Sequence, residues 1–458
     1  MSDTLAHILA TDLEQNLEIV SKNDTEKVKK IRAEALASLK KLGLPKQSDE
    51  LWRFTNVRKH FEESGKLMHP FLPPEDVNTP IREIFQCNVN ELDTYDLAII
   101  NGWYPRTLPL FQTLTDGAVI GSFSEALDLY PDFIDAHFAQ YADYKSDALT
   151  ALNTAYASDG VFAWIPENTK VAKPIQIVNL VSQPEGSFFQ QLIQPRNLII
   201  VEKNAQVRLV LCDHTLSNNK SLTNMVTEIF VDEGASLEVY RLQNQNNNGA
   251  LISRLNVHQK DHSQVTVNTI TLNGGFVRNE TSLVIDGEYS EANLYGTHLT
   301  DRTQHVDNNT FIDHRKPNSI SNELFKAILD DDASGVFRGR IMVRKDAQNT
   351  NSYQANNNLL LTDTARMNTM PQLEIYADDV KCSHGATVGY LGAEELFYLR
   401  ARGISEKEAR LLLMSAFVGE IVEKINIPAV RDRITYLVSK RLRGELSHCA
   451  TCVLNCRE

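Results

Sequence analysis

The longest regular pattern in the chain is an alternation of apolar and polar residues that begins near residue 158 and continues for more than 200 positions. Such alternation is typical of β-strands, because successive side chains of a strand point to opposite faces. Within it a short motif recurs, in which a small residue is followed by apolar residues at the second and fourth positions after it. Copies begin at Ala205, Ala235, Ser263 and, in a weaker form, Ser290.

The spacing of these copies indicates how the strands are arranged. Successive copies begin 30, 28 and 27 residues apart, within the range of periods found in stacked repeats. One coil cannot close a hydrophobic core alone, so neighbouring coils stack and bury a continuous one. A twisted β-sandwich produces similar alternation, but the long period and the length of the region favour a solenoid. We therefore predict a mainly β protein with a parallel β-helix core over residues 141–389.

A helical pattern precedes this core. Between residues 26 and 39, every third or fourth position is apolar, which is the spacing of one helix face. Gly43 and Pro45 predict the end of that helix. Together with a mixed pattern further along the chain, this helix defines an N-terminal helical and mixed domain over residues 1–140.

Helical spacing returns in a C-terminal helical domain over residues 390–458. Ser405 and Glu408 form a capping box that opens a long helix with apolar residues on more than one side. A second helix, rich in basic residues, is predicted from about residue 430 to 442. The wide apolar surface and the basic second helix predict that this hairpin binds a partner protein. The contact side chains proposed on this basis are Leu412, Leu413, Phe417, Arg431 and Arg433.

Composition and charge narrow the classes of function. The 458 residues are 42% hydrophobic, enough to bury a large core. A net charge of −13 argues against a nucleic-acid-binding or anionic-membrane-binding surface. We expect no transmembrane helix, because no apolar run approaches about 18 residues, and no secretory signal. Isolated cysteines, such as Cys87 and Cys212, fit a reducing compartment, so we expect a cytoplasmic protein.

The strongest candidate for chemistry is a strand-like run over residues 373–389. Its Cys382 and His384 are two residues apart and therefore share one face of the strand. A thiolate and an imidazole suit iron, zinc or persulfide sulfur. The alternative interpretation is structural, since free cysteine is often simply buried. The histidine would then be a hydrogen-bonded core residue.

Two further groups of residues resemble metal ligands. Cys449, Cys452 and Cys456 near the C-terminus supply three thiolates for a cluster or zinc. The same spacing places them on one helix face, where they would only pack. The second group is interpreted as turn residues between coils rather than as a metal site. It comprises His298, His305, His314, Asp301, Asp307 and Asp313.

No motif for catalysis is present in the sequence. It contains neither a Walker A motif nor a Gly-x-Ser-x-Gly nucleophile elbow, so we expect a protein that is not an enzyme. An alternative function is a carbohydrate-binding or polysaccharide-lyase-like β-helix, since stacked coils often carry a sugar groove. Such a lyase needs an acidic cluster for calcium beside a basic residue, and the run Asp330 to Asp332 is a poor substitute.

Several segments, in the order in which they occur, resemble the SufB/SufD family of SUF iron–sulfur cluster assembly scaffolds, and its SufD members in particular. Each match is weak alone, but the set in one order is specific. Besides the run over 373–389, the segments are Leu44–Thr55, Ala151–Gly160, His305–Thr310, His314–Ser319 and Glu395–Ile404.

The resemblance implies a right-handed parallel β-helix and a non-catalytic scaffold that pairs with a SufB-like subunit. It implies that the C-terminal helices dock on a SufC-like ATPase, so that removal of residues 391–458 abolishes ATPase binding and leaves the β core folded. Cys382 and His384 would lie at the contact with SufB, where iron enters and the nascent cluster forms. No cofactor would be stably bound, only transient iron or an iron–sulfur cluster shared with SufB. A homodimer remains open for the chain alone.

Overall fold

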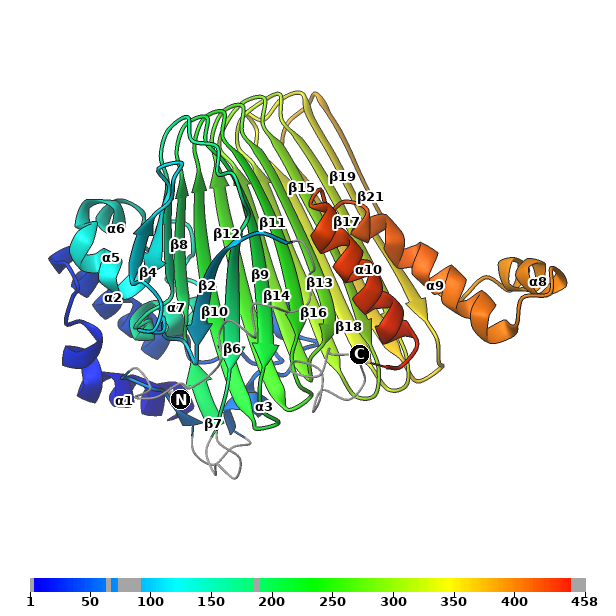
Figure 1. Cartoon of the computed structure of the whole chain (residues 1–458), viewed down its shortest axis with the longest axis horizontal. Helices are drawn as coiled ribbons and strands as arrows, with labels where there is room; N and C mark the ends of the chain where they lie inside the picture. The colour runs from blue at the N-terminus through cyan, green and yellow to red at the C-terminus, as the bar shows by residue number, and fades with distance from the viewer. Residues whose placement is uncertain (1–3, 63–66, 73–91, 184–189, 446–458) are drawn as a thin grey trace.

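The core of the protein is a parallel β-solenoid built from two facing sheets (Figure 1). The computed structural model describes residues 4–62, 67–72, 92–183 and 190–445. From β9 onward, consecutive strands alternate between the two sheets, and each strand pairs in parallel with the next strand but one. Each coil therefore adds one strand to each sheet. The predicted mainly β fold with a parallel β-helix core and helices at both ends is confirmed.

The two sheets differ in how they begin at the N-terminal end. Sheet A starts with a short antiparallel pair, β3 and β4, whereas sheet B is parallel throughout. Sheet A follows the order β3 (Phe111–Thr113), β4 (Val119–Ser122), β5 (Val161–Ile165), β8 (Arg196–Val201), β10 (Ser221–Val231), β12 (Gly249–Gln259), β14 (Phe276–Ile285), β16 (His305–His314), β18 (Ser334–Val343) and β20 (Arg366–Ile375), with β1 (Leu67–Met68) and β7 (Gln190–Ile193) to one side. Sheet B follows the order β2 (Tyr95–Ile100), β6 (Ile175–Val181), β9 (Gln206–Thr215), β11 (Ser236–Asn244), β13 (Gln264–Asn273), β15 (Glu291–Thr300), β17 (Ile320–Leu329), β19 (Thr350–Leu360) and β21 (Val380–Gly389).

The recurring small residue marks the tight turn that leads into each strand of sheet B. Ala205, Ala235 and Ser263 are fully buried directly before β9, β11 and β13. The residue before each of them has a positive φ, as at Asn204 and Gly234. Such a turn brings the next residue against the neighbouring coils, where only a small side chain fits. The motif is therefore a consequence of the coil geometry.

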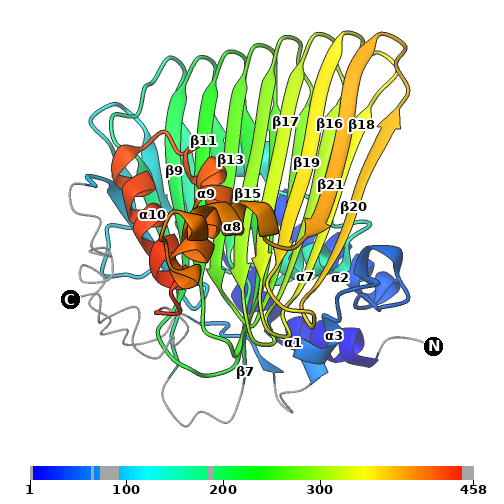
Figure 2. The same cartoon turned by 90° about the vertical axis from the view of Figure 1, so that its right-hand side faces the viewer.

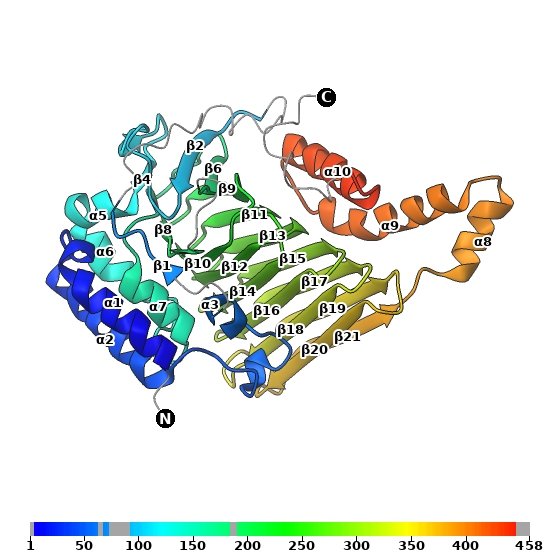
Figure 3. The same ribbon diagram turned by 90° about the horizontal axis from the view of Figure 1, so that it is seen from below.

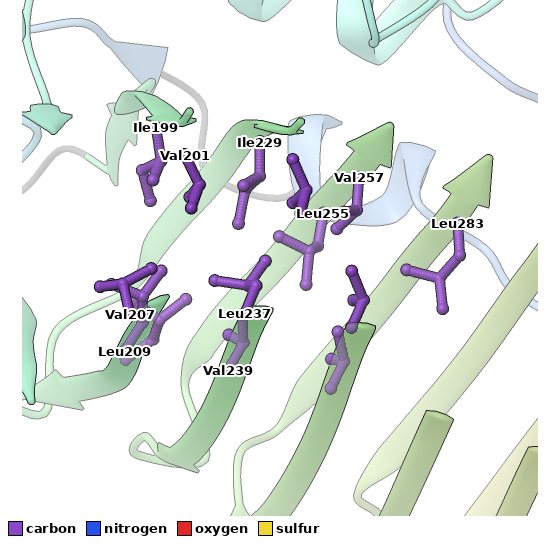
Figure 4. Packing of buried hydrophobic residues seen from close by; sticks show 14 of the residues in the cluster. Ile199, Val201, Val207, Leu209, Ile229, Leu237, Val239, Leu255, Val257 and Leu283 are labelled. Atoms are coloured by element: carbon purple, nitrogen blue, oxygen red, sulfur yellow. The ribbon is translucent and has the colours of Figure 1, made fainter. Parts of the chain in front are cut away.

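The apolar residues of the motif fill the inside of the solenoid. Leu237 and Val239 of β11 pair in register with Val207 and Leu209 of β9, and all four side chains point inward (Figure 4). They meet inward residues of sheet A, such as Leu255. Burial of stacked aliphatic side chains of this kind contributes about 1.5–3 kcal/mol each.

The N-terminal helices pack against the outer face of sheet A (Figure 3). They are α1 (Thr4–Val20), α2 (Glu26–Leu42), α3 (Arg58–Glu62), α5 (Phe123–Leu129), α6 (Pro131–His137) and α7 (Ala148–Tyr156), with a short 3-10 helix at Glu50–Trp52. The predicted apolar stripe of α2 is buried, and Thr25 caps its first turn by accepting a hydrogen bond from the Val28 amide. Strands β2 and β4 lie within the predicted N-terminal region 1–140, yet they are part of the two solenoid sheets, β2 of sheet B and β4 of sheet A.

The C-terminal helices have two different environments. They are α8 (Ala393–Ala401), α9 (Glu406–Val422), whose predicted cap Ser405 accepts from the Glu408 amide, and α10 (Pro428–Leu442). Helix α8 and the start of α9 project away from the solenoid (Figures 1 and 3). The end of α9 and all of α10 pack on the outer face of sheet B.

Arg441 of α10 anchors this covering helix to the sheet. Its guanidinium is buried and donates to both carboxylate oxygens of Asp301, at 2.6 and 2.8 Å, and to the carbonyl of Leu272. Apolar residues of sheet B, such as Ile270 and Tyr240, lie beneath the helices. The expectation that the β core is independent of residues 391–458 therefore conflicts with the packing, because their removal uncovers this apolar face. No helix in the described ranges is long and apolar enough to cross a membrane.

Candidate functional site

The repeat motif continues to the end of the solenoid, but its inward positions become polar in the last three coils. The frame set by Ala205 and its equivalents continues at Ser319, Thr350 and Val380, which occupy matching positions in register. The second and fourth positions after each of these starts are no longer aliphatic. They are Ser321 and Glu323, then Ser352 and Gln354, then Cys382 and His384.

These residues form two inward-facing columns across β17, β19 and β21. Cys382 is paired in register with Ser352, which is paired with Ser321. The hydroxyl groups of Ser321 and Ser352 are 2.6 Å apart, and the Ser321 hydroxyl is 2.9 Å from Nε2 of the buried His314. A polar hydrogen-bonded column thus leads from the terminal coil into the interior.

The second column ends at His384 and contains a buried carboxylate. His384 is paired in register with Gln354, which is paired with Glu323. The Gln354 side-chain amide donates to a Glu323 carboxylate oxygen at 2.6 Å, and both residues are 3% exposed. Burial raises the pKa of Glu323 to about 7, although the hydrogen bond from Gln354 opposes the rise.

The raised pKa of Glu323 gives a pH-dependent stability. Between about pH 4.5 and 7 the folded chain holds a proton that the unfolded chain releases, so stability falls as the pH rises through this window. At pH 8 the full penalty applies, about 3 kcal/mol for a shift of this size. Glu323→Gln is therefore expected to raise the free energy of unfolding by about that amount at pH 8 and by little at pH 4.5.

The measurement for this expectation is urea unfolding of wild type and variant at both pH values. The exposed Glu394, replaced in the same way, serves as the control. An equal difference for Glu323→Gln at pH 4.5 and pH 8 would contradict the assignment of a buried, protonated carboxyl.

Cys382 is half-buried against the interior cluster. Burial raises the pKa of its thiol, and a hydrogen bond from the Ser352 backbone opposes the rise to a lesser extent. At neutral pH the group is therefore a protonated thiol. Metal binding requires the thiolate, so a metal bound here would displace a proton.

His384 lies two residues further along β21 and is exposed to solvent. Strand β21 is the terminal strand of sheet B and β20 is the terminal strand of sheet A, so in the described residues both outer edges lack a strand partner (Figure 2). The inward face of this coil has no further coil above it. The predicted pair of Cys382 and His384 therefore shares one face at the open end of the solenoid.

The pair supplies too few ligands for a closed metal site. A structural zinc or iron site takes four ligands from the protein. Within the described ranges, no group of three or more His, Cys, Asp or Glu side chains is placed to hold a metal ion. A metal bound at Cys382 and His384 would need further ligands from outside the described residues or from bound sulfide.

The five proposed partner contacts have unequal accessibility. Leu412 on α9 is 50% exposed, whereas Leu413 and Phe417 are half-buried, and Phe417 lies under the Lys326 ammonium group. Arg431 and Arg433 are half-exposed on α10. The predicted contacts do not include the more exposed apolar residues of α8, Phe397 at 74% and Tyr398 at 57%. The sequence pattern that could have identified Phe397 and Tyr398 is a cluster of apolar residues between the strand-like run over 373–389 and the capping box at Ser405.

Two other groups resemble metal ligands, the C-terminal cysteines and the set of histidines and aspartates. Cys449, Cys452 and Cys456 lie outside the described residues. The placement of six histidines and aspartates in turns between coils was wrong for five of them, which lie within strands β15 and β16, whereas Asp301 directly follows β15. Each has a structural partner: Asp301 holds Arg441, Asp313 holds Arg315 and Arg344, Asp307 holds Arg278, His298 contacts Asn308, His305 contacts Ser334, and His314 contacts Ser321.

Two family models together match most of the chain. Residues 182–417 match the model of the SUF system FeS cluster assembly SufBD core domain, and residues 8–177 match the SufBD protein N-terminal region. The chain belongs to the SufBD family. A SufBD family protein of Synechocystis sp., slr0076, is 30% identical, with 89% of each chain covered.

Two other relatives are similar over nearly their whole length. The iron–sulfur cluster assembly protein SufD of Escherichia coli is 26% identical, covering 89% of this chain and 92% of its own. The chloroplastic protein ABCI7 of Arabidopsis thaliana is 27% identical, covering 94% and 90%. Membership of the SufBD family leaves the carbohydrate-binding interpretation without support.

The other SufBD-like segments of the sequence stabilise the fold. Trp52 stacks on the buried Arg278 guanidinium, 3.7 Å from the ring centroid, and Thr55 hydrogen-bonds to Asp307 and His305. These contacts fix the first SufBD-like segment to sheet A. Asp159 accepts hydrogen bonds from the amides of residues 104, 124 and 160.

Proposed function

We propose that this SufBD protein is a SufD-type, non-catalytic scaffold subunit of a SUF complex, in which a SufB-like subunit pairs with the open end of the solenoid. Iron entry and nascent cluster formation take place at this contact. The observation that carries the proposal is the placement of Cys382 and His384. They replace the inward aliphatic pair of the repeat in the last coil, whose inner face is covered by no further coil of the described residues.

The strand edges at this end support the position of the partner. Terminal strands β20 and β21 are each 10 residues long. Long edges with unpaired N–H and C=O groups are templates for another chain. A sister subunit that adds here would bring its own ligands beside Cys382 and His384, and the iron or cluster would be shared and transient. This requires reduced thiols, which fits Cys212 and Cys382, neither of which forms a disulfide within the described residues, and a cytoplasmic location.

Amide hydrogen exchange tests the proposed interface. We expect that co-expression with a SufB-like and a SufC-like protein yields a complex in which the amides of β20 and β21 exchange at least tenfold more slowly than in the chain alone. Amides of the internal strand β11 serve as the control, because they are already paired on both sides. A stable complex without added protection at β20 and β21 would place the SufB-like subunit elsewhere.

The projecting arm is the proposed dock for the SufC-like ATPase. We define the arm as α8 and the first half of α9, which project from the solenoid (Figure 3). Its residues Phe397, Tyr398 and Leu412 are exposed. An apolar set of this kind on a monomer surface marks a site of protein contact. ATP-driven movement of the ATPase would act on the arm, which is connected to β21 by residues 390–392.

Charge on the arm is expected to disrupt ATPase capture without unfolding the chain. Phe397→Asp and Leu412→Asp should each lower the amount of SufC-like protein that co-purifies by tenfold or more, because a carboxylate would be buried in an apolar contact. Ile8→Asp is the control, since Ile8 is 59% exposed on α1, far from the arm. Capture at the wild-type level by both arm variants would exclude the arm as the dock.

A further inference from the structure

One edge of the solenoid is formed by the turns that lead from sheet A into sheet B, and in seven consecutive turns one residue has a positive φ. The amide of this residue donates to the carbonyl that precedes the matching position of the next coil, as in the bonds from Gly234 to Asp261 and from His262 to Glu288, both 2.8 Å. The column of matching positions reads Asn168, Asn204, Gly234, His262, Tyr289, Asn318 and Asn349. Five of these seven residues are asparagine or glycine, which tolerate the conformation best.

His262 and Tyr289 are the exceptions, and they occupy neighbouring coils. Their φ values are 56° and 55°, a conformation in which the backbone crowds the Cβ of a bulky side chain. The two rings stack with 5.3 Å between their centroids and 7° between their planes. Both residues are exposed to solvent, Tyr289 at 60%. Core packing therefore does not explain the strained pair, and strain of this kind is concentrated at functional positions.

The turns that hold the pair carry carboxylates without a cationic partner. Asp261, Glu288 and Glu291 accept hydrogen bonds from a backbone amide or an asparagine side chain, and within the described residues none of the three forms a salt bridge. By contrast, Lys260 and Asp286 of the same turns are paired with each other at 2.9 Å. The exposed rings therefore lie in turns with uncompensated negative charge.

We propose that the stack of His262 and Tyr289 is a docking surface for a basic segment of a partner protein, in which an arginine stacks on the exposed ring of Tyr289. A guanidinium is planar and always charged, and it binds to the face of an aromatic ring more often than an ammonium group does. The neighbouring carboxylates attract such a segment and repel nucleic acid or an anionic membrane. The surface lies beside β13 and β15 in the middle of sheet B, so the inference is independent of the function proposed for the open end and the arm.

The test measures the affinity of the full-length chain for a fluorescently labelled tetra-arginine peptide, by anisotropy at low ionic strength and about pH 8. The variant carries both His262→Asn and Tyr289→Asn. It keeps the net charge of the chain, because histidine is neutral at this pH. We expect the affinity for the peptide to fall about fivefold, since one exposed cation–π contact corresponds to a factor of about two to five.

Asparagine suits the variant because it already fills the column elsewhere. The side chain of Asn204 donates to that of Asn168 at 3.0 Å, and the side chain of Asn349 donates to that of Asn318 at 3.1 Å. The unfolding midpoint of the double variant in urea should therefore equal or exceed that of wild type.

Tyr376→Asn is the matched control. Tyr376 is 61% exposed in a turn of the same edge and precedes Asp378 and Asp379, but within the described residues it stacks on no other ring. This variant should bind the tetra-arginine peptide as wild type does. A tetra-lysine peptide should lose less affinity than the tetra-arginine peptide in the double variant, because an ammonium group does not stack on a ring.

Each outcome decides for or against the inference. Equal tetra-arginine affinity in wild type and the double variant would overturn it, because binding would then follow the negative charge of the chain alone. A lower unfolding midpoint in the double variant would also overturn it, since the stack would then stabilise the fold. A selective loss of tetra-arginine affinity with an unchanged or higher midpoint supports the docking surface.

Discussion

Replacement of either Cys382 or His384 with alanine is expected to lower the iron or cluster content of the reconstituted complex by tenfold or more. Each substitution removes one of the two predicted ligands at the open end. A soft thiolate and a borderline imidazole suit a transient iron–sulfur intermediate, and within the described residues they belong to no larger group of potential metal ligands. Folding and complex assembly should be nearly unchanged, because His384 is exposed and Cys382 is half-buried at the last coil.

The measurement is iron and sulfide per complex after anaerobic reconstitution, with the unfolding midpoint recorded for each variant. Ser383→Ala is the matched control, because Ser383 lies between the two ligands on the opposite face of β21. The isolated chain should bind iron weakly. A stoichiometric, tightly held cluster on the isolated chain that neither substitution changes would refute the shared site.

Removal of α10 is expected to destabilise the whole solenoid. A chain that ends at Ile427 lacks four buried apolar side chains, Val430, Ile434, Leu437 and Val438, and the buried pair of Arg441 with Asp301. At about 1.5–3 kcal/mol for each apolar side chain, the loss is on the order of 5 kcal/mol or more, comparable with the total stability of many domains. We expect a large drop in the unfolding midpoint or an insoluble product.

A chain that ends at Glu445 is the control for this truncation, since it retains α10 and the contacts of Arg441 with Asp301 and Leu272. Both chains would be compared by urea unfolding under the same conditions. An unfolding midpoint within error of wild type for the shorter chain would show that the apolar face of sheet B does not need its helical cover.

The repeat was predictable because its cause is local. A positive φ at Asn204 or Gly234 and a small residue after it are requirements of the coil turn, and such requirements leave a period in the sequence. The capping box at Ser405 is local for the same reason. The frame also extends to Cys382 and His384, but the inward positions there are polar, so a search for apolar residues ended before the site.

The environment of the C-terminal helices was not predictable from spacing. Basic residues of a helix usually face solvent, so the pattern gave no reason to expect Arg441 to be buried against Asp301. Whether Phe417 or Phe397 faces solvent depends on which part of the hairpin the sheet covers, and that is a property of the tertiary fold. The sequence therefore predicted a partner-binding hairpin. The predicted contact residues, however, lie partly on the segment that sheet B covers and partly on the projecting segment.

The difference between the two ends of the solenoid limits how many chains can join. A rod of stacked strands can in principle elongate without limit, as a fibril does. Here one end presents the long edges of β20 and β21, whereas the other ends in β3, three residues long, and β2, six residues long, with the N-terminal helices alongside. Short, flanked edges are poor templates. When two chains join through their long edges, those edges become paired and cannot bind a third chain. The assembly therefore ends at a pair, whether the second chain is a sister subunit or another copy.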